Sequence, residues 1–191
     1  GQQVGGIIGC CQSAEAAYTS CKVQDCRFNS DYTTGYIGGI VGCDYNVATF
    51  EDNTVKNLTV NAPKATNGNI GGIAGRVTNG AATAVFKNPI VNGLTVPTTG
   101  QSVGGILGYL DAVDTRIEKP QLSDITLTIQ NRYVGGVAGY SDATKLNISN
   151  ATVSGLDLYS SGGTQTQCYA AGILGYPHAG ESTITDAKVS N

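Results

Sequence analysis

A seven-residue phrase rich in glycine occurs six times along the chain, and this repetition constrains the fold more than any other feature of the sequence. Its third and sixth residues are glycine in every copy, and its first and fourth residues are apolar. The copies are Val4–Cys10, Ile37–Cys43, Ile70–Arg76, Val103–Tyr109, Val134–Tyr140 and Ala170–Tyr176. Starting points 31 to 36 residues apart predict an array of similar units, each stacked on its neighbour.

A second phrase follows each copy and contains a change of phase. In Val55–Val60, apolar and polar residues alternate as in a strand on both sides of Asn57, but the two halves are out of phase. We therefore expect a one-residue corner between two short strands. The residues at this position adopt a left-handed backbone at little cost: Asp25, Asn57, Gly93, Asp124, Gly155 and Asn191. A third apolar position precedes this phrase in every repeat, at Tyr18, Phe50, Phe86, Ile117, Ile148 and Ile184.

Three short apolar segments per repeat, without helical periodicity, argue against ankyrin or tetratricopeptide arrays. The composition agrees, with 27 glycines and only 13% charged residues. We expect an all-β fold, a parallel and right-handed β-helix solenoid of about six coils with three short strands per coil, as a single domain over residues 1–191. One core ladder is expected to contain Leu58, Leu94, Ile125 and Leu156, with Cys26 as a buried thiol at its end. Because the chain stops at Val189–Asn191 before the next strand is complete, we expect it to be a piece of a longer protein.

The glycines of the first phrase have a structural explanation. A dinucleotide-binding loop needs a helix after its glycines, and no copy precedes a helical pattern. We expect these glycines to permit a close backbone approach or a bulge within a strand. At the first glycine position the last copy has Ala171, so small size matters there more than a positive φ. Periodicity alone does not assign a face to Ile8 and its equivalents.

The core of the phrase, Gly-Ile/Val-x-Gly, resembles the GLUG motif of secreted and surface-attached bacterial proteins. The resemblance covers all six copies, with Ile or Val where the family name has Leu. It implies an extracellular or cell-surface protein in which the solenoid is a spacer, scaffold or adhesive segment. The motif of the family supplies no catalytic residue.

Nucleophilic catalysis finds little support in the sequence. His178 is the only histidine, which excludes a multi-histidine metal site, and we expect it to be a loop residue in solvent. The string Gly100–Gly104 matches the Gly-x-Ser-x-Gly pattern, but Ser102 is followed by the fourth glycine phrase and not by a helix. We therefore predict no catalytic residue and no Ser-His-Asp site.

The acidic residues are candidates for carbohydrate chemistry because β-solenoids host enzymes that use carboxylate pairs or calcium. The candidates are Glu51 with Asp52, Asp111 with Asp114 and Glu118, and Asp142. They fall in different parts of different coils, so we expect solvated loop acids and no required cofactor. Calcium bound by Asp44, Asp111 and Asp142, which follow copies of the glycine phrase, is left open.

The six cysteines lack the spacing of a zinc ribbon. The repeat register makes Cys10 and Cys43 neighbours in one ladder, with Cα atoms about 4.8 Å apart, so they are a candidate disulfide. Cys168 lies about four coils away, roughly 19 Å, which excludes a full intrachain disulfide framework.

Two surface features are candidates for binding. The outward row Arg27, Thr59, Thr95, Thr126 and Asp157 resembles the threonine arrays of ice-binding solenoids, but β-branched residues also suit exposed strand positions. The long insertion between Tyr159 and Tyr169 is polar and contains glycine, and such loops present hydrogen-bonding groups to partners. Its candidate ligand-binding residues are Ser160, Ser161, Thr164, Gln165, Thr166 and Gln167.

Charge and hydropathy limit the partners. A net charge of −3 without a basic stripe argues against nucleic acid. No run of about 18 apolar residues and no signal-peptide pattern is present, so membrane insertion is not expected. We expect a non-enzymatic spacer or adhesin-like segment whose partners are a glycan, a host or cell-surface protein, or flanking domains of its parent chain. A carbohydrate-binding or carbohydrate-active β-helix is the second interpretation, and an ice-binding solenoid is the third.

Overall fold

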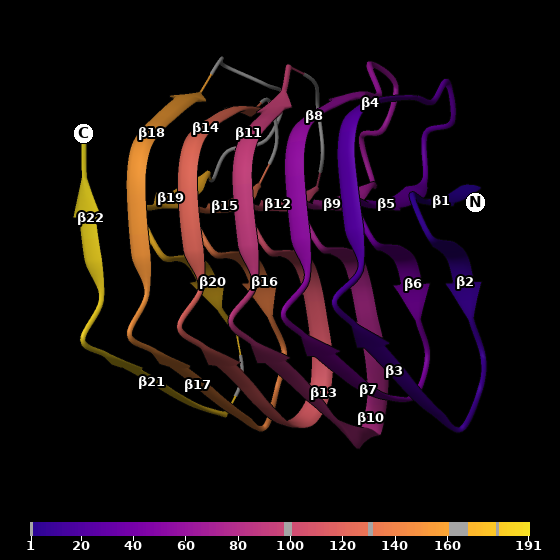
Figure 1. Ribbon diagram of the computed structural model, residues 1–191, viewed down its shortest axis with the longest axis vertical. Coiled ribbons are helices and arrows are strands. Elements are labelled where there is room, and N and C mark those ends of the chain that lie inside the picture. The colour runs from indigo at the N-terminus through magenta and orange to yellow at the C-terminus, as the bar shows by residue number, and fades with distance from the viewer. Residues whose placement is uncertain (1, 98–100, 130–131, 161–167, 179) are drawn as a thin grey trace.

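The computed structural model describes residues 2–97, 101–129, 132–160, 168–178 and 180–191, and every helix or strand in these residues is a β-strand. All strand pairs are parallel, and three sheets stack coil upon coil into a solenoid of about 5 turns (Figure 1). The predicted all-β parallel solenoid with three sheets is confirmed. No helix that could span a membrane occurs in these described ranges.

Sheet one runs along the solenoid between the other two. It consists of β1 (Gln2–Gly5), β5 (Gly35–Gly38), β9 (Asn69–Gly71), β12 (Ser102–Gly104), β15 (Tyr133–Gly135) and β19 (Tyr169–Ala171). Sheet three consists of β4 (Lys22–Asn29), β8 (Thr54–Asn61), β11 (Ile90–Val96), β14 (Gln121–Ile129), β18 (Thr152–Ser160) and β22 (Lys188–Ser190). Each of these two sheets therefore contains one strand from every repeat.

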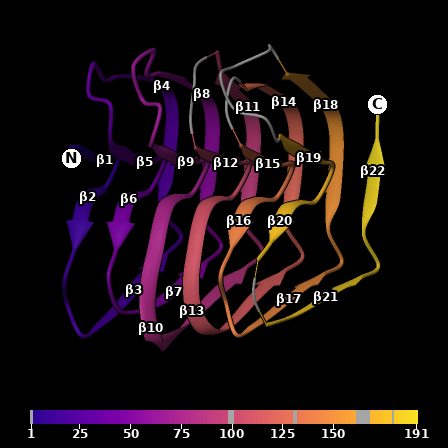
Figure 2. The same cartoon turned by 180° about the vertical axis from the view of Figure 1, so that it is seen from behind.

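Sheet two has two forms. In the third and fourth coils it is one long strand, β10 (Ala74–Lys87) or β13 (Leu107–Glu118), which Figure 2 shows as continuous ribbons. The other coils have two shorter strands: β2 (Ile8–Cys11) with β3 (Glu15–Thr19), β6 (Val41–Asp44) with β7 (Val47–Glu51), β16 (Ala138–Ser141) with β17 (Lys145–Ser149), and β20 (Leu174–Pro177) with β21 (Glu181–Thr185).

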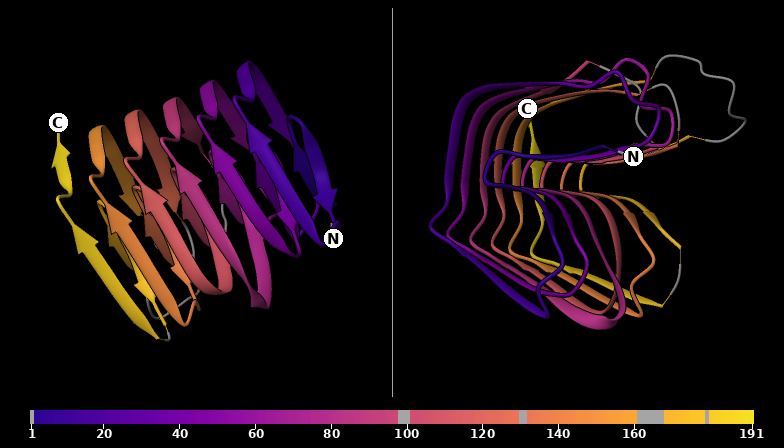
Figure 3. Two further views of the ribbon diagram at one scale, coloured as in Figure 1. Left: turned by 60° about the horizontal axis from the view of Figure 1, so that its bottom comes forward. Right: turned by 90° about the vertical axis from the view of Figure 1, so that its right-hand side faces the viewer.

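The solenoid is right-handed, as predicted. In Figure 1 the N-terminal end lies on the right, and the strands of sheet three run upward on the near face. On the opposite face, seen in Figure 2, β2 and β6 run downward. A chain that rises at the front, descends at the back and advances from right to left forms a right-handed coil. The right-hand view in Figure 3 shows the coils nested one behind another with similar outlines, so each repeat follows a similar path.

The corners predicted from the phase change are present. The left-handed residues are Asp25 (φ 54°), Asn57 (φ 49°), Gly93 (φ 72°), Asp124 (φ 55°) and Gly155 (φ 56°). Neighbouring corners bond to each other, and Asn57 Nδ2 donates to Asp25 Oδ1 at 2.7 Å. These single residues reverse the side-chain alternation without interrupting the strand.

A second row of left-handed corners was not predicted. It joins sheet two to sheet three at Ser20, Asp52, Asn88, Lys119, Asn150 and Asp186. In the first two coils the buried Asn53 ties this corner together, because its Nδ2 donates to Tyr18 O at 2.7 Å and its Oδ1 accepts from Cys21 N at 2.9 Å. The first five repeats therefore each have two left-handed bends, five residues apart.

The glycine phrase is a tight turn, and the expected bulge within one strand is wrong. β5 ends at Gly38, the chain bends at Gly39 and Ile40, and β6 starts at Val41. The predicted close approach is confirmed: a Cβ on Gly39 would collide with the carbonyl oxygen of Gly72 in the next coil and lie 2.7 Å from Val55 Cγ2 of sheet three. A backbone carbonyl cannot move aside, so only glycine fits here.

The turn explains why two consecutive residues of the phrase are apolar. Its tip points into the interior, and Ile40 and Val41 are both fully buried. The third-coil equivalents Ile73 and Ala74 are buried in the same way. Periodicity could not assign a face because both residues belong to the core.

The core ladders have the predicted register. Leu58 pairs with Leu94, Leu94 with Ile125, and Ile125 with Leu156, and the first three are fully buried. Cys26 pairs with Leu58 as expected, but it is half-buried and not the buried thiol that was predicted. The aromatic ladder is also present, with Tyr18 and Phe50 rings 4.6 Å apart and Phe50 and Phe86 rings 4.4 Å apart.

Candidate ligand-binding site

The glycine turn folds sheet two back beneath sheet one, so that the residues on either side of the turn face each other. The sheet-one row, in register, is Gln3, Tyr36, Asn69, Ser102, Tyr133 and Tyr169. The opposing sheet-two row is Cys10, Cys43, Arg76, Tyr109, Tyr140 and Tyr176. We call these two rows the tyrosine wedge. It lies outside the main core, and most of its side chains are half-exposed.

Four tyrosines form one cluster at the C-terminal end of the wedge. The Tyr133 ring lies 4.8 Å from that of Tyr140 and 4.9 Å from that of Tyr176. Tyr169 closes the group, with its ring centroid 4.6 Å from that of Tyr176. Burial, followed by the charge of Asp142, raises the pKa of Tyr140 above its ordinary value. Its hydroxyl therefore stays protonated and can donate a hydrogen bond.

Arg76 occupies the middle of the wedge. Its guanidinium lies over the rings of Tyr36 and Tyr109, 5.0 and 4.8 Å from their centroids, and its Nη1 donates to the Tyr36 hydroxyl at 2.6 Å. Nη2 is 3.4 Å from Thr78 Oγ1, which is 3.3 Å from Asp111 Oδ2. The cation–π contacts and the hydrogen bond fix the arginine between two aromatic rings.

The wedge also contains buried polar atoms without a protein partner. They are Asn69 Oδ1, Ser102 Oγ and Arg76 Nε, and the residues Asn69 and Ser102 are 4% and 0% exposed. All three lie in the coils between Tyr36 and Tyr133. Leaving such atoms unpaired is costly, so they mark a place where water or a ligand group is favourable.

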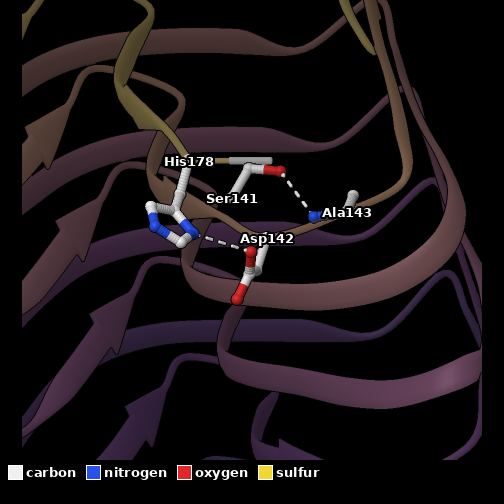
Figure 4. Close-up of polar contacts among 4 residues, drawn as sticks. All are labelled: Ser141, Asp142, Ala143 and His178. Carbon is white, nitrogen blue, oxygen red and sulfur yellow. Dashed lines mark hydrogen bonds and ion pairs between the residues drawn. The ribbon is translucent and has the colours of Figure 1, made fainter. Parts of the chain in front are cut away.

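His178 stands at the mouth of the wedge and is, as predicted, an exposed residue outside the strands. It is 53% exposed, but its Nδ1 lies 3.0 Å from Asp142 Oδ1, as Figure 4 shows. Its ring also packs 5.8 Å from Tyr140 and 5.9 Å from Tyr176. The neighbouring Ser141 accepts a hydrogen bond from Ala143 N at 3.3 Å and is fully buried, so these residues do not form a nucleophile–base pair.

The predicted acidic residues occupy separate environments. Asp44 is buried and accepts hydrogen bonds from the Tyr18 hydroxyl at 2.6 Å and from Asn46 N at 3.0 Å. Asp114 pairs with Arg116 at 3.0 Å, and Asp52 accepts from Asn88 at 3.0 Å. Glu51 and Glu118 are register neighbours of Lys87. Within the described residues, no three His, Cys, Asp or Glu side chains are placed to hold a metal ion.

The remaining predicted residues form four groups. Cys10 and Cys43 are register partners as expected, and both are free thiols in the structure. Ser102 carries one of the buried unpaired hydroxyls of the wedge. The insertion residues Ser161, Thr164, Gln165, Thr166 and Gln167 lie outside the described residues, and Ser160 ends β18 opposite Ile129. The row from Arg27 to Asp157 has the expected register on the outer face of sheet three.

The tyrosine wedge was not predicted, although the sequence contains a signal for it. Tyr36, Tyr133 and Tyr169 each directly precede a glycine phrase, and Tyr109, Tyr140 and Tyr176 each end one. The two groups are seven residues apart, so their contact depends on the turn that the phrase forms. If the phrase were a bulge within one strand, the two groups of tyrosines would lie on separate parts of that strand.

Comparison with known proteins adds no relatives. No family model matches the sequence, and no curated protein or solved structure matches it. The fold and the side-chain arrangement are therefore the grounds on which a function is proposed.

Proposed function

We propose that this chain is a non-enzymatic, adhesin-like segment of an extracellular or cell-surface protein, and that it binds a glycan through the C-terminal end of the tyrosine wedge. The cluster of Tyr133, Tyr140, Tyr169 and Tyr176 is the observation that carries the proposal. Sugar rings have apolar faces that stack on aromatic rings and hydroxyls that need polar partners. Half-exposed tyrosines offer both on one surface.

Two neighbouring features support a binding role. His178 and Asp142 add a donor and an acceptor beside the rings. The His178 ring centroid lies 5.8 Å from that of Tyr140 and 5.9 Å from that of Tyr176. In the sequence, the candidate segment from Ser160 to Gln167 ends two residues before Tyr169, the first residue of β19. The resemblance to GLUG repeats is consistent with the same adhesive role.

Glycan-array binding of the chain tests the proposal. The double variant Tyr133→Leu with Tyr176→Leu is expected to lose at least tenfold in affinity, because leucine fills space but offers no flat ring or hydroxyl. The matched control is Tyr32→Leu with Tyr159→Leu, since these two tyrosines are 59% and 60% exposed and lie outside the wedge. Equal losses in both double variants would reject the wedge as the site.

Replacing Ser160 to Gln167 by a short Gly-Ser link tests the loop separately. The expected result is loss of glycan binding with little change in melting, because a loop can change length without disturbing the ladders. Full retention of binding would remove the loop from the site and leave the tyrosines as its only candidate.

The enzymatic alternative makes an opposite prediction. Turnover of polysaccharide, abolished by Asp111→Asn or Glu118→Gln, would establish a carbohydrate-active enzyme. On our proposal neither substitution changes glycan binding, and no cleavage is detected with or without calcium.

A further inference from the structure

A second hollowed surface lies on the outer face of sheet three, away from the tyrosine wedge. Two adjoining hollows of about 400 and 270 Å³ share Ile90 in their lining. The larger one extends over Lys119, Ser123 and Ser154, and the smaller one over Lys22 and Lys56. We call this combined surface the sheet-three furrow.

The furrow runs parallel to the solenoid axis because its lining residues repeat from coil to coil. One lining row is Thr54, Ile90, Gln121 and Thr152, in register. The other is Lys56, Ser123 and Ser154, with Asn92 in register between Lys56 and Ser123 but outside the lining. Between the rows the strands point Val55, Val91, Leu122 and Val153 into the core. Hydroxyl, amide and ammonium groups therefore recur at a spacing of about 4.8 Å along the furrow.

The charged residues of the lining are all basic. Lys22, Lys56 and Lys119 are its charged residues among those described, and no carboxylate lines either hollow there. The acids Asp25, Asp52 and Asp124 of the two corner rows stand at the edges of the furrow and keep their charge, where each accepts a hydrogen bond from a neighbouring amide: Asp25 from Asn57 at 2.7 Å, Asp52 from Asn88 at 3.0 Å and Asp124 from Asn92 at 3.2 Å. The excess of positive charge is therefore confined to the described lining itself, in a chain with a net charge of −3.

We propose that the sheet-three furrow binds a linear acidic polysaccharide whose chain lies along the solenoid axis. One sugar residue of an extended polysaccharide is similar in length to one coil, so successive sugars meet equivalent polar groups. The lysines pair with carboxylate or sulfate groups, and Gln121, Ser123 and Thr152 bond to hydroxyls. The described lining contains no aromatic residue, so stacking of nucleic-acid bases has no platform.

Isothermal titration of the whole chain with polygalacturonate, heparin and neutral dextran tests this proposal. Binding of at least one acidic polymer, without binding of dextran, is expected. Lys56→Gln with Lys119→Gln is expected to weaken it at least tenfold. The control Lys64→Gln with Lys145→Gln removes the same charge from exposed positions outside the furrow and is expected to change affinity less than twofold.

Three results would overturn the proposal: equal weakening by the two lysine pairs, equal binding of dextran, or binding of poly-glutamate or single-stranded DNA as tight as that of the polysaccharide. A second variant, Ser123→Trp, fills the larger hollow without changing charge and is expected to weaken binding by a similar factor with an unchanged circular dichroism spectrum. Tyr133→Leu with Tyr176→Leu is expected to leave this binding unaltered, so failure here is distinguishable from failure at the wedge.

Discussion

The core ladders and the tyrosine wedge are built by the same stacking but differ in how far their residues vary. In the core, Leu58, Leu94 and Ile125 occupy equivalent positions and are all aliphatic and fully buried. In the wedge, the equivalent positions of successive coils hold Asn69 and Ser102 before changing to tyrosine. The repeated register fixes where each side chain stands in both regions.

The difference follows from what surrounds each row. A core residue is enclosed by three sheets, so a change of shape leaves a cavity or a clash. A wedge residue is enclosed by two sheets and open at the mouth, so residues of different size and polarity can be accommodated. The repeated positions maintain the solenoid, and the varied positions provide a surface that can acquire a ligand.

The largest expected effect tests the core half of this comparison. Leu94→Ala is expected to reduce the free energy of unfolding by about 2–5 kcal/mol, because the close-packed ladder cannot collapse into the gap. Thr95→Ala, on the outward side of the same strand, is expected to change it by less than about 0.5 kcal/mol. Urea denaturation measures both, and equal changes would contradict the assignment of the two faces.

The sequence predicted those parts of the fold that leave a mark in the pattern of neighbouring residues. The corner at Asn57 was predictable because a single residue reverses the alternation on either side of it. The corner at Lys119 was missed because lysine is uncommon in the left-handed region, although the odd spacing of the buried residues Ile117 and Leu122 marks a phase change there too. The core ladder could be read directly from the period, since identical spacing gives identical register.

The wedge could not be predicted because its contacts depend on a three-dimensional turn. A bulge and a reversal both require glycine, and only the contacts of Gly39 with Gly72 and Val55 distinguish them. The pairing of His178 with Asp142 does not depend on that turn, because the two residues follow the register partners Ser141 and Pro177 and are one repeat apart. The register that brought Cys10 beside Cys43 was accessible, since it needs only the repeat period.

Alkaline pH is expected to show where the wedge resembles the core. Cys43 belongs to the wedge but is fully buried, and burial raises its thiol pKa to about 12 from an ordinary 9.0. Between these values the unfolded chain releases a proton that the folded chain retains, so stability falls with rising pH, by up to about 1.4 kcal/mol per pH unit from this group.

Denaturation in reducing buffer at pH 8 and pH 10.5 measures this loss. Cys43→Ala is expected to lose less stability than the unsubstituted chain between the two pH values, because it lacks the retained proton. Parallel pH profiles for the two proteins would show that Cys43 is not shielded from water and that the wedge is open at this end.

The smallest expected effect compares two unpaired hydroxyls, one in each region. Thr115 Oγ1 is buried in a core ladder between Ala84 and Leu146, where nothing polar on the ladder can hold a water molecule. Thr115→Val is therefore expected to stabilise the protein by about 1 kcal/mol, because it removes an unsatisfied group at nearly constant shape.

Ser102 is equally buried, but its wedge neighbourhood contains the unpaired atoms of Asn69 and Arg76, which can share a water molecule with it. Ser102→Ala is expected to be neutral or slightly destabilising in the same urea experiment. Stabilisation of similar size by both substitutions would mean that the middle of the wedge is as dry as the core, and that its polar atoms hold neither water nor ligand.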